Sequence, residues 1–119
     1  MPINPKSSFQ YSETLTFSGN TSSTAADARY YDKFSYQLDW SGLTGLSSTI
    51  IPQVSNDGST WVDLENAWDD IIYTLDAASG TQVWIFSSVA ARYVRMNYVA
   101  NGNTTGTATL LFEGQRFDL

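Results

Sequence analysis

Apolar and polar side chains alternate along much of the chain, with a period of two that predicts β-strands rather than helices. The clearest run covers residues 30–40, where apolar side chains from Phe34 to Trp40 occupy every second position. A second run, residues 91–98, alternates over its whole length. Because successive side chains of a strand point to opposite faces, each run offers one face to a core and one to water.

Six further segments carry a shorter version of this pattern and are separated by residues that favour turns. The expected strands, about eight in all, cover residues 9–17, 30–40, 48–55, 59–64, 71–75, 82–86, 92–99 and 107–113. No stretch repeats apolar residues convincingly at the helical spacing of three and four. Short strands with regular turn signals are typical of all-β folds, and we predict an antiparallel β-sandwich of the jelly-roll type.

Three consecutive residues, Asn56, Asp57 and Gly58, form the strongest turn signal. Asn and Asp bond to their own backbone, and Gly adopts positive φ without steric cost. Apolar residues on both sides of this turn predict a β-hairpin whose second strand contains Trp61. Residues 18–28, by contrast, are almost all small or polar, and we expect a long connection that is mobile or becomes ordered on a partner.

The expected domain organisation is an arm followed by one folded unit. Residues 1–8 contain two of the three prolines, each of which fixes φ and lacks a backbone donor, so we expect an extended arm. Residues 9–119 suffice for a single β-sandwich domain with one core.

Composition restricts the chemistry. The chain has no cysteine and no histidine, which removes thiolate chemistry, imidazole proton transfer and any Ser-His-Asp triad. We therefore expect no enzymatic activity and no cofactor. The net charge of −6 disfavours nucleic acid as a partner. No window has the apolar length of a membrane span or a signal peptide, so we expect neither membrane insertion nor a leader.

Two kinds of site remain conceivable from single residues. Asp69 and Asp70, with Asp63 and Glu65 nearby, could offer oxygen ligands to calcium. Adjacent strand residues point to opposite faces, so a solvated loop is the favoured interpretation and no metal site is predicted. The sequence also matches the N-glycosylation pattern twice, at Asn20 and Asn103, but such short patterns are frequent by chance in a chain rich in Ser and Thr.

The four tryptophans divide into two groups. Trp40, Trp61 and Trp84 lie in strand patterns, which favours the core, whereas Trp68 lies in a polar stretch. Trp68 with Tyr30 or Tyr31 is therefore the candidate platform for stacking on a sugar or for anchoring a protein interface.

The segment from Ser55 to Trp61, paired with the segment from Ala91 to Met96, resembles the discoidin or coagulation-factor C-type domain, a galactose-binding-like jelly roll. The resemblance implies that Trp61 and Tyr93 are core positions and that Arg95 belongs to a structural ion pair. The terminal cysteine pair of that family is absent here, so its lipid-binding or sugar-binding loops do not carry over.

The same motif pair, in a compact and cysteine-free chain rich in Ser and Thr, is also similar in layout to small virion proteins of tailed bacteriophages. That similarity implies a non-enzymatic structural protein of the capsid or tail, made in the host cytoplasm and found in the virion. Its partners would be other virion proteins and copies of itself, with a trimer favoured. The alternative is a carbohydrate-binding module of the discoidin-like type.

Overall fold

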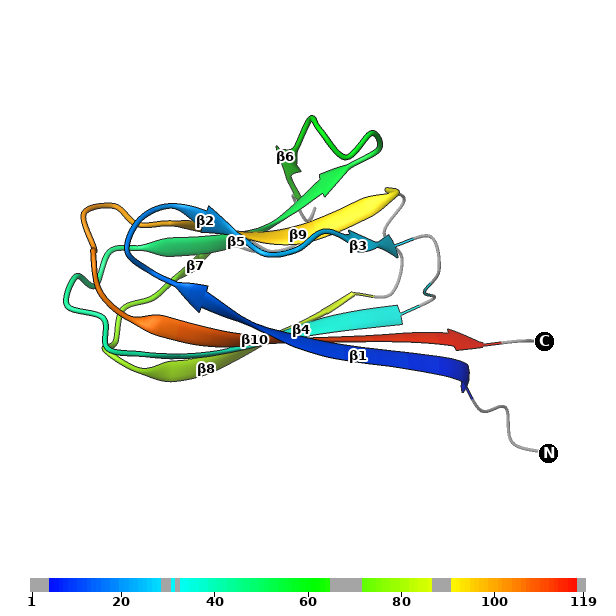
Figure 1. Cartoon of the computed structure of the whole chain (residues 1–119), viewed down its shortest axis with the longest axis horizontal. Coiled ribbons are helices and arrows are strands. Elements are labelled where there is room, and N and C mark those ends of the chain that lie inside the picture. The colour runs from blue at the N-terminus through cyan, green and yellow to red at the C-terminus, as the bar shows by residue number, and fades with distance from the viewer. Residues whose placement is uncertain (1–4, 29–30, 32, 65–71, 87–90, 118–119) are drawn as a thin grey trace.

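The computed structural model describes residues 5–28, 31, 33–64, 72–86 and 91–117. These residues form two antiparallel β-sheets that pack face to face, as Figure 1 shows. The predicted antiparallel sandwich is confirmed, with ten strands in the described residues where about eight were expected. Within the same residues, no helix is long and apolar enough to cross a membrane.

The first sheet joins the two ends of the chain. Its four strands, in spatial order, are β1 (Pro5–Thr16), β10 (Thr107–Phe117), β4 (Lys33–Ser41) and β8 (Gly80–Phe86). Because β1 begins at Pro5 and pairs with β10 from there, residues 5–8 of the expected arm belong to this sheet. Residues 1–4 lie outside the described residues.

The second sheet is built around β9 (Tyr93–Val99) and β5 (Thr49–Ser55), which pair along their whole length. Four strands of two residues each complete it: β2 (Thr21–Ser22) and β3 (Ala26–Asp27) on β9, and β6 (Val62–Asp63) and β7 (Tyr73–Thr74) on β5.

Residues 18–28 therefore do not form the free connection expected from their composition. They run along β9, and Ser23 fixes them there: its N–H donates to the carbonyl of Met96 (2.9 Å), and its hydroxyl accepts the N–H of Met96 (2.8 Å). Glu13 of β1 holds the same segment from the other side, because its carboxylate accepts the N–H (2.8 Å) and the hydroxyl (2.7 Å) of Thr24. The segment is ordered by this chain itself.

The core lies between the sheets. Its buried members are Leu15, Phe17, Ala26, Ala28, Phe34, Tyr36, Leu38, Trp40, Leu43, Ile50, Leu75, Trp84, Val94, Met96, Tyr98, Ala100, Ala108, Leu110 and Phe112. Phe17 stacks on Tyr98 with ring centroids 3.9 Å apart. The alternation from Phe34 to Trp40 is confirmed, since every second side chain of β4 is buried. Stacked and edge-on aromatic pairs stabilise the core beyond the burial of apolar area alone.

Candidate functional site

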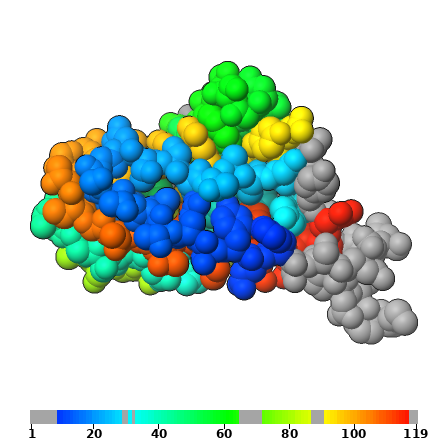
Figure 2. Space-filling view, viewed as in Figure 1, coloured from blue at the N-terminus to red at the C-terminus, as the bar shows by residue number. Residues whose placement is uncertain are grey.

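A hairpin between β5 and β6 stands off the second sheet and forms a knob on the molecular surface (Figures 1 and 2). Asp57 shapes its tip, because one carboxylate oxygen accepts the N–H groups of Ser59 and Thr60, both at 2.8 Å. The hydroxyl of Ser55 accepts the N–H of Gly58 (2.9 Å) and donates to Asp57 (2.9 Å). These bonds stabilise the carboxylate and lower the pKa of Asp57 to about 2.

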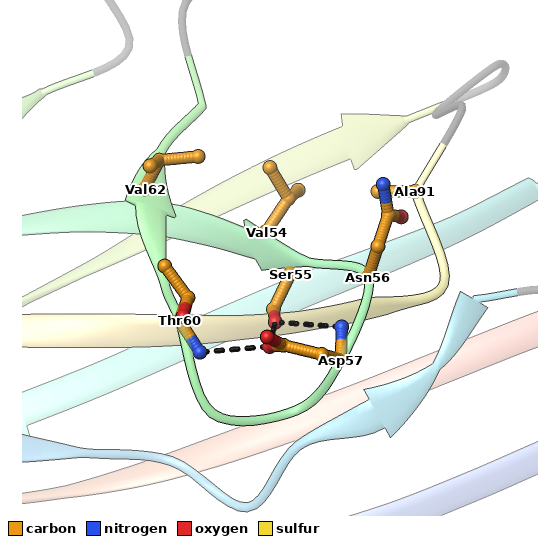
Figure 3. Close-up of a pocket in the computed structure, with 7 residues that line it drawn as sticks. All are labelled: Val54, Ser55, Asn56, Asp57, Thr60, Val62 and Ala91. Atoms are coloured by element: carbon orange, nitrogen blue, oxygen red, sulfur yellow. Dashed lines mark hydrogen bonds between the residues drawn. The ribbon is translucent and has the colours of Figure 1, made fainter.

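One side of this hairpin borders a cavity of about 420 Å³, shown in Figure 3. Val54, Val62 and Ala91 supply its apolar lining, while its polar groups are engaged in the turn. The amide oxygen of Asn56, for example, accepts the N–H of Arg92 (3.1 Å) and ties the hairpin to the start of β9. The predicted turn chemistry is therefore structural, and the cavity is suited to an apolar contact.

Three residues singled out from the sequence, Trp61, Asp63 and Arg95, come together on the outer side of the second sheet. The guanidinium carbon of Arg95 lies 4.2 Å from the ring centroid of Trp61, within cation–π range. Arg95 Nε also donates to the side-chain oxygen of Gln53 (3.0 Å), whose amide nitrogen donates to the carboxylate of Asp63 (3.0 Å). Among the described residues, Gln53 thus relays between Arg95 and a carboxylate, in place of the direct ion pair that the resemblance implied.

Trp61 and Tyr93 occupy a different place from the one that the resemblance implied. Both are half-buried, and neither belongs to the core cluster. The inward residues of β9 are Val94, Met96 and Tyr98, all fully buried, so Tyr93 and Arg95 point outward. A shift of one residue in a strand moves a side chain to the opposite face, and for Tyr93 this parity separates the implied from the observed position. Trp61 precedes β6 and lies outside the strands.

The result is a surface of two cations and two aromatic rings. The guanidinium of Arg92 lies 4.9 Å from the ring centroid of Tyr93, and a methyl group added at Gly58 would contact the same ring. We call Trp61, Arg92, Tyr93 and Arg95 the arginine–aromatic surface. Partial burial lowers the pKa of Arg95, but a guanidinium stays charged at any physiological pH.

Tyr31 lines a second cavity, of about 480 Å³, between β1 and the segment that carries β3. Its ring meets Phe112 edge-on at 5.5 Å and stacks with Phe9 at 6.4 Å, and the side chain of Phe9 is 49% exposed. We call this cavity the aromatic groove. The other two members of the predicted platform, Tyr30 and Trp68, lie outside the described residues.

Polar groups border the aromatic groove at one end. The Tyr11 hydroxyl donates to the carbonyl of Thr24 (3.3 Å), and Glu13 binds Thr24 as described above. Burial and the neighbouring Glu13 raise the pKa of Tyr11 to about 12, so this hydroxyl remains a donor at neutral pH. Sequence reasoning missed the groove, although one signal pointed to it: Glu13 interrupts the apolar side of an otherwise regular strand.

The two glycosylation patterns are in different environments. Asn103 is 2% exposed and its side chain bonds to five groups, so the folded protein does not offer it to a modifying enzyme. Asn20 is exposed, with its amide oxygen accepting the N–H of Ala100 (2.8 Å).

The conceivable calcium ligands are not brought together in the described part of the chain. Of the four carboxylates, only Asp63 lies there, and it bonds to Gln53; Glu65, Asp69 and Asp70 lie outside it. No group of three or more acidic residues suited to a metal ion occurs among the described residues.

No family model matches the chain, and no curated protein matches it. Similar folds do occur among solved structures. The SPBc2 prophage-derived protein YomS is 15% identical, with a TM-score of 0.51 over 90% of this chain and 95% of YomS. A protein of Bacillus endospore appendages, which form a family of disulfide-linked pili, is 11% identical, with a TM-score of 0.53 over 98% of this chain and 95% of its own.

The Yersinia pseudotuberculosis-derived mitogen is 11% identical over 98% of this chain and 91% of its own, and its TM-score of 0.46 is too low to support an argument. At these identities the likeness shows the fold alone, an all-β sandwich. Because no family model matches, the discoidin resemblance stays a prediction.

Proposed function

We propose that this protein is a non-enzymatic structural subunit of a virion-like particle, part of the capsid decoration or of the tail, and that it works through protein–protein contacts. The observation that carries the proposal is the arginine–aromatic surface beneath the raised hairpin. Trp, Tyr and Arg dominate the energetic centres of protein interfaces, because they combine a large contact area with polar groups that fix orientation. Here two of the six basic residues of the chain place their guanidinium groups over the rings of half-buried aromatic residues.

The origin of the fold neighbours supports a role in assemblies. YomS derives from a prophage, and the spore appendages are pili. Those pili are disulfide-linked, whereas this chain has no cysteine, so contacts between its copies would be non-covalent. We further propose a homo-oligomer, with a trimer favoured, whose symmetry follows that of the particle. The protein would be made in the host cytoplasm and reside in the virion.

Sedimentation of particles from the strain that encodes the protein tests this proposal. The wild-type chain should sediment with the particles in a fixed ratio to their major protein, as quantified by mass spectrometry. Replacing both Trp61 and Arg95 with Ala should release the chain into the soluble fraction, while Leu46→Ala, at a 49% exposed apolar side chain elsewhere, should not. A wild-type chain found only in the soluble fraction would contradict the proposal.

A carbohydrate-binding module is the second candidate, and the aromatic groove is the observation that favours it. Phe9 and Tyr31 present apolar rings next to hydroxyl and carboxylate groups, the combination that suits a sugar. Glycan-array screening decides between the candidates. A reproducible ligand that is lost in Tyr31→Ala and kept in Leu46→Ala would place this function first, and an array without any ligand would remove it.

A further inference from the structure

Strand β8 forms one edge of the first sheet, and the described residues provide a neighbour, β4, on one side only. Its outward side chains are Thr81, Val83 and Ile85, of which Val83 is 46% and Ile85 is 77% exposed. The strand contains no charged residue and no proline. An extended, apolar and uncharged edge of this kind is a template for pairing with another strand.

The other edges are protected. Strands β2, β3, β6 and β7 have two residues each, too short to template much pairing. Strand β1 is long, but it carries the charged Glu13, and Thr24 lies along its flank, bonded to Glu13. Soluble proteins protect edges by these same means, namely short length, charge and coverage. Among the described edges, β8 is the exception.

We propose that β8 pairs antiparallel with β8 of a second copy of this chain, about a two-fold axis that passes beside Val83. Two strands related by such an axis overlap completely only when their central residue lies on it, and Val83 is the centre of Gly80–Phe86. The two four-stranded sheets then become one continuous sheet of eight strands. Because the contact uses the same patch twice, it closes on itself and forms no fibre.

The side chains of β8 are compatible with this register. On the outer face, Val83 lies opposite Val83 of the second copy, and Thr81 lies opposite Ile85, which covers the most exposed apolar side chain. Cross-strand pairs of β-branched residues stabilise antiparallel sheets. Of the residues that pair with Thr81, Val83 and Ile85 on β4, only Asp39 is charged, and it accepts the hydroxyl of Thr81 (2.5 Å). Across the axis, the row that contains Asp39 continues to Ile85 and Ser35 of the second copy before it reaches Glu113 on β10. The two β8 strands of this acidic chain therefore meet where neither carries a charge.

This inference rests on the homo-oligomer part of the proposed function and adds its contact surface. It does not depend on the particle. A trimer needs a different contact, and both contacts together would give a hexamer of dihedral symmetry.

Light scattering of the full chain during size-exclusion chromatography, over a series of concentrations, tests the contact. The expected mass is twice the 13.2 kDa of the chain. Val83→Lys should reduce the measured mass by half, because two like charges would face each other across the axis. Ile85→Lys should do the same, because it replaces the most exposed apolar side chain of the contact with a charge opposite the uncharged Thr81. Val62→Lys, at a β-branched residue 58% exposed on β6, is the matched control and should leave the mass unchanged.

The outcomes separate this inference from the rest of the proposal. A dimer that falls to a monomer in both lysine variants supports pairing through β8, and so does a hexamer that falls to a trimer in both. A wild-type monomer at all concentrations overturns both the pairing and the homo-oligomer, while sedimentation with particles remains a separate result. A trimer, or a dimer that persists in both lysine variants, overturns the pairing alone.

A second measurement decides the matter if the lysine variants fail to fold. The chain has no cysteine, so Val83→Cys introduces a single thiol beside the proposed axis. Directly opposed residues of paired strands lie within the Cα separation that a disulfide spans. Mild oxidation should convert most of this variant into a covalent dimer, and Val62→Cys should stay mainly monomeric. Equal cross-linking of the two variants would overturn the pairing.

Discussion

Replacing Asn103 should lower the free energy of unfolding by more than the small size of its side chain suggests. Its amide oxygen accepts the N–H of Gly45 (2.9 Å) and of Thr44 (3.2 Å). Its amide nitrogen donates to the hydroxyl of the fully buried Tyr98 (3.0 Å) and to the carbonyl of Thr105 (2.6 Å). One side chain thereby joins the loop after β4, the inward face of β9 and the loop before β10.

The cost of Asn103→Ala follows from the groups left without a partner. Thr44 N–H keeps a bond to the hydroxyl of Thr105 (3.1 Å), so its loss is small. The N–H of Gly45 and the hydroxyl of Tyr98 lose the amide, and each buried polar group without a partner costs about 1–3 kcal/mol. Allowing for water that enters from the exposed loop side, we expect a loss of about 3–4 kcal/mol, a large part of the typical 5–15 kcal/mol.

Urea unfolding followed by tryptophan fluorescence measures this loss as a shift in midpoint at constant slope. Asn20→Ala is the matched control, because Asn20 belongs to the other glycosylation pattern and holds one backbone N–H at an exposed site. It should cost about 0.5–1.5 kcal/mol. If both variants lost the same free energy of unfolding, or if Asn103→Ala lost less than about 1 kcal/mol, the role of Asn103 in joining the two loops to β9 would be refuted.

Three further predictions use the same unfolding assay or NMR. Trp61→Ala should cost about 1–2 kcal/mol, because it removes a cation–π contact with Arg95 and a half-buried ring rather than a core side chain; a loss of about 3–5 kcal/mol would return Trp61 to the core. The carboxyl of Asp57 should titrate with a pKa of about 2, below the ordinary pKa of 3.8. Its contribution to stability is therefore complete above pH 3.8 and disappears as the pH falls through 2. An ordinary pKa, measured by NMR, would contradict the turn geometry. Gly114→Ala should displace the Tyr31 ring, which occupies the space of the added methyl group, and cost about 1–3 kcal/mol; unchanged NMR shifts for that ring would disprove the contact.

Sequence reasoning worked where one face of a strand was plainly apolar and the other plainly polar. Strand β4 is the example, since its polar positions, such as Gln37 and Asp39, leave one choice of core face and the structure agrees. The hairpin at Asn56–Gly58 was also predictable, because the turn residues bond to their own backbone and need no tertiary contact.

Sequence reasoning failed where the residues that fix a buried face or a strand pairing are distant in the sequence. Strand β9 carries aromatic or aliphatic residues on both faces, so its alternation predicts a strand without telling which face is buried. The only apolar side chains in residues 18–28 are small alanines, yet the segment pairs with β9, and Ser23 exchanges bonds with Met96, 73 residues away. A local pattern holds no information on such a partner.

The aromatic groove was hidden for a similar reason. Phe9 and Tyr11 belong to β1, Tyr31 follows β3, and Phe112 lies on β10. Only the pairing of the two chain ends, β1 with β10, brings these rings together. Glu13 looked like a defect in the strand pattern, whereas it is the residue that binds the opposite wall through Thr24.

The two contact surfaces proposed here lie on different sheets, and this separation has a consequence for assembly. The arginine–aromatic surface covers the outer face of the second sheet, whereas Val83 and Ile85 lie on the edge of the first sheet. The two proposals together predict a subunit that pairs with a copy of itself while it binds a particle, since the two contacts use different sheets. Val83→Lys should abolish pairing and leave sedimentation with particles intact, while Arg95→Ala should weaken sedimentation in a chain that still pairs. Were either change to abolish both properties, the two surfaces would be parts of a single interface.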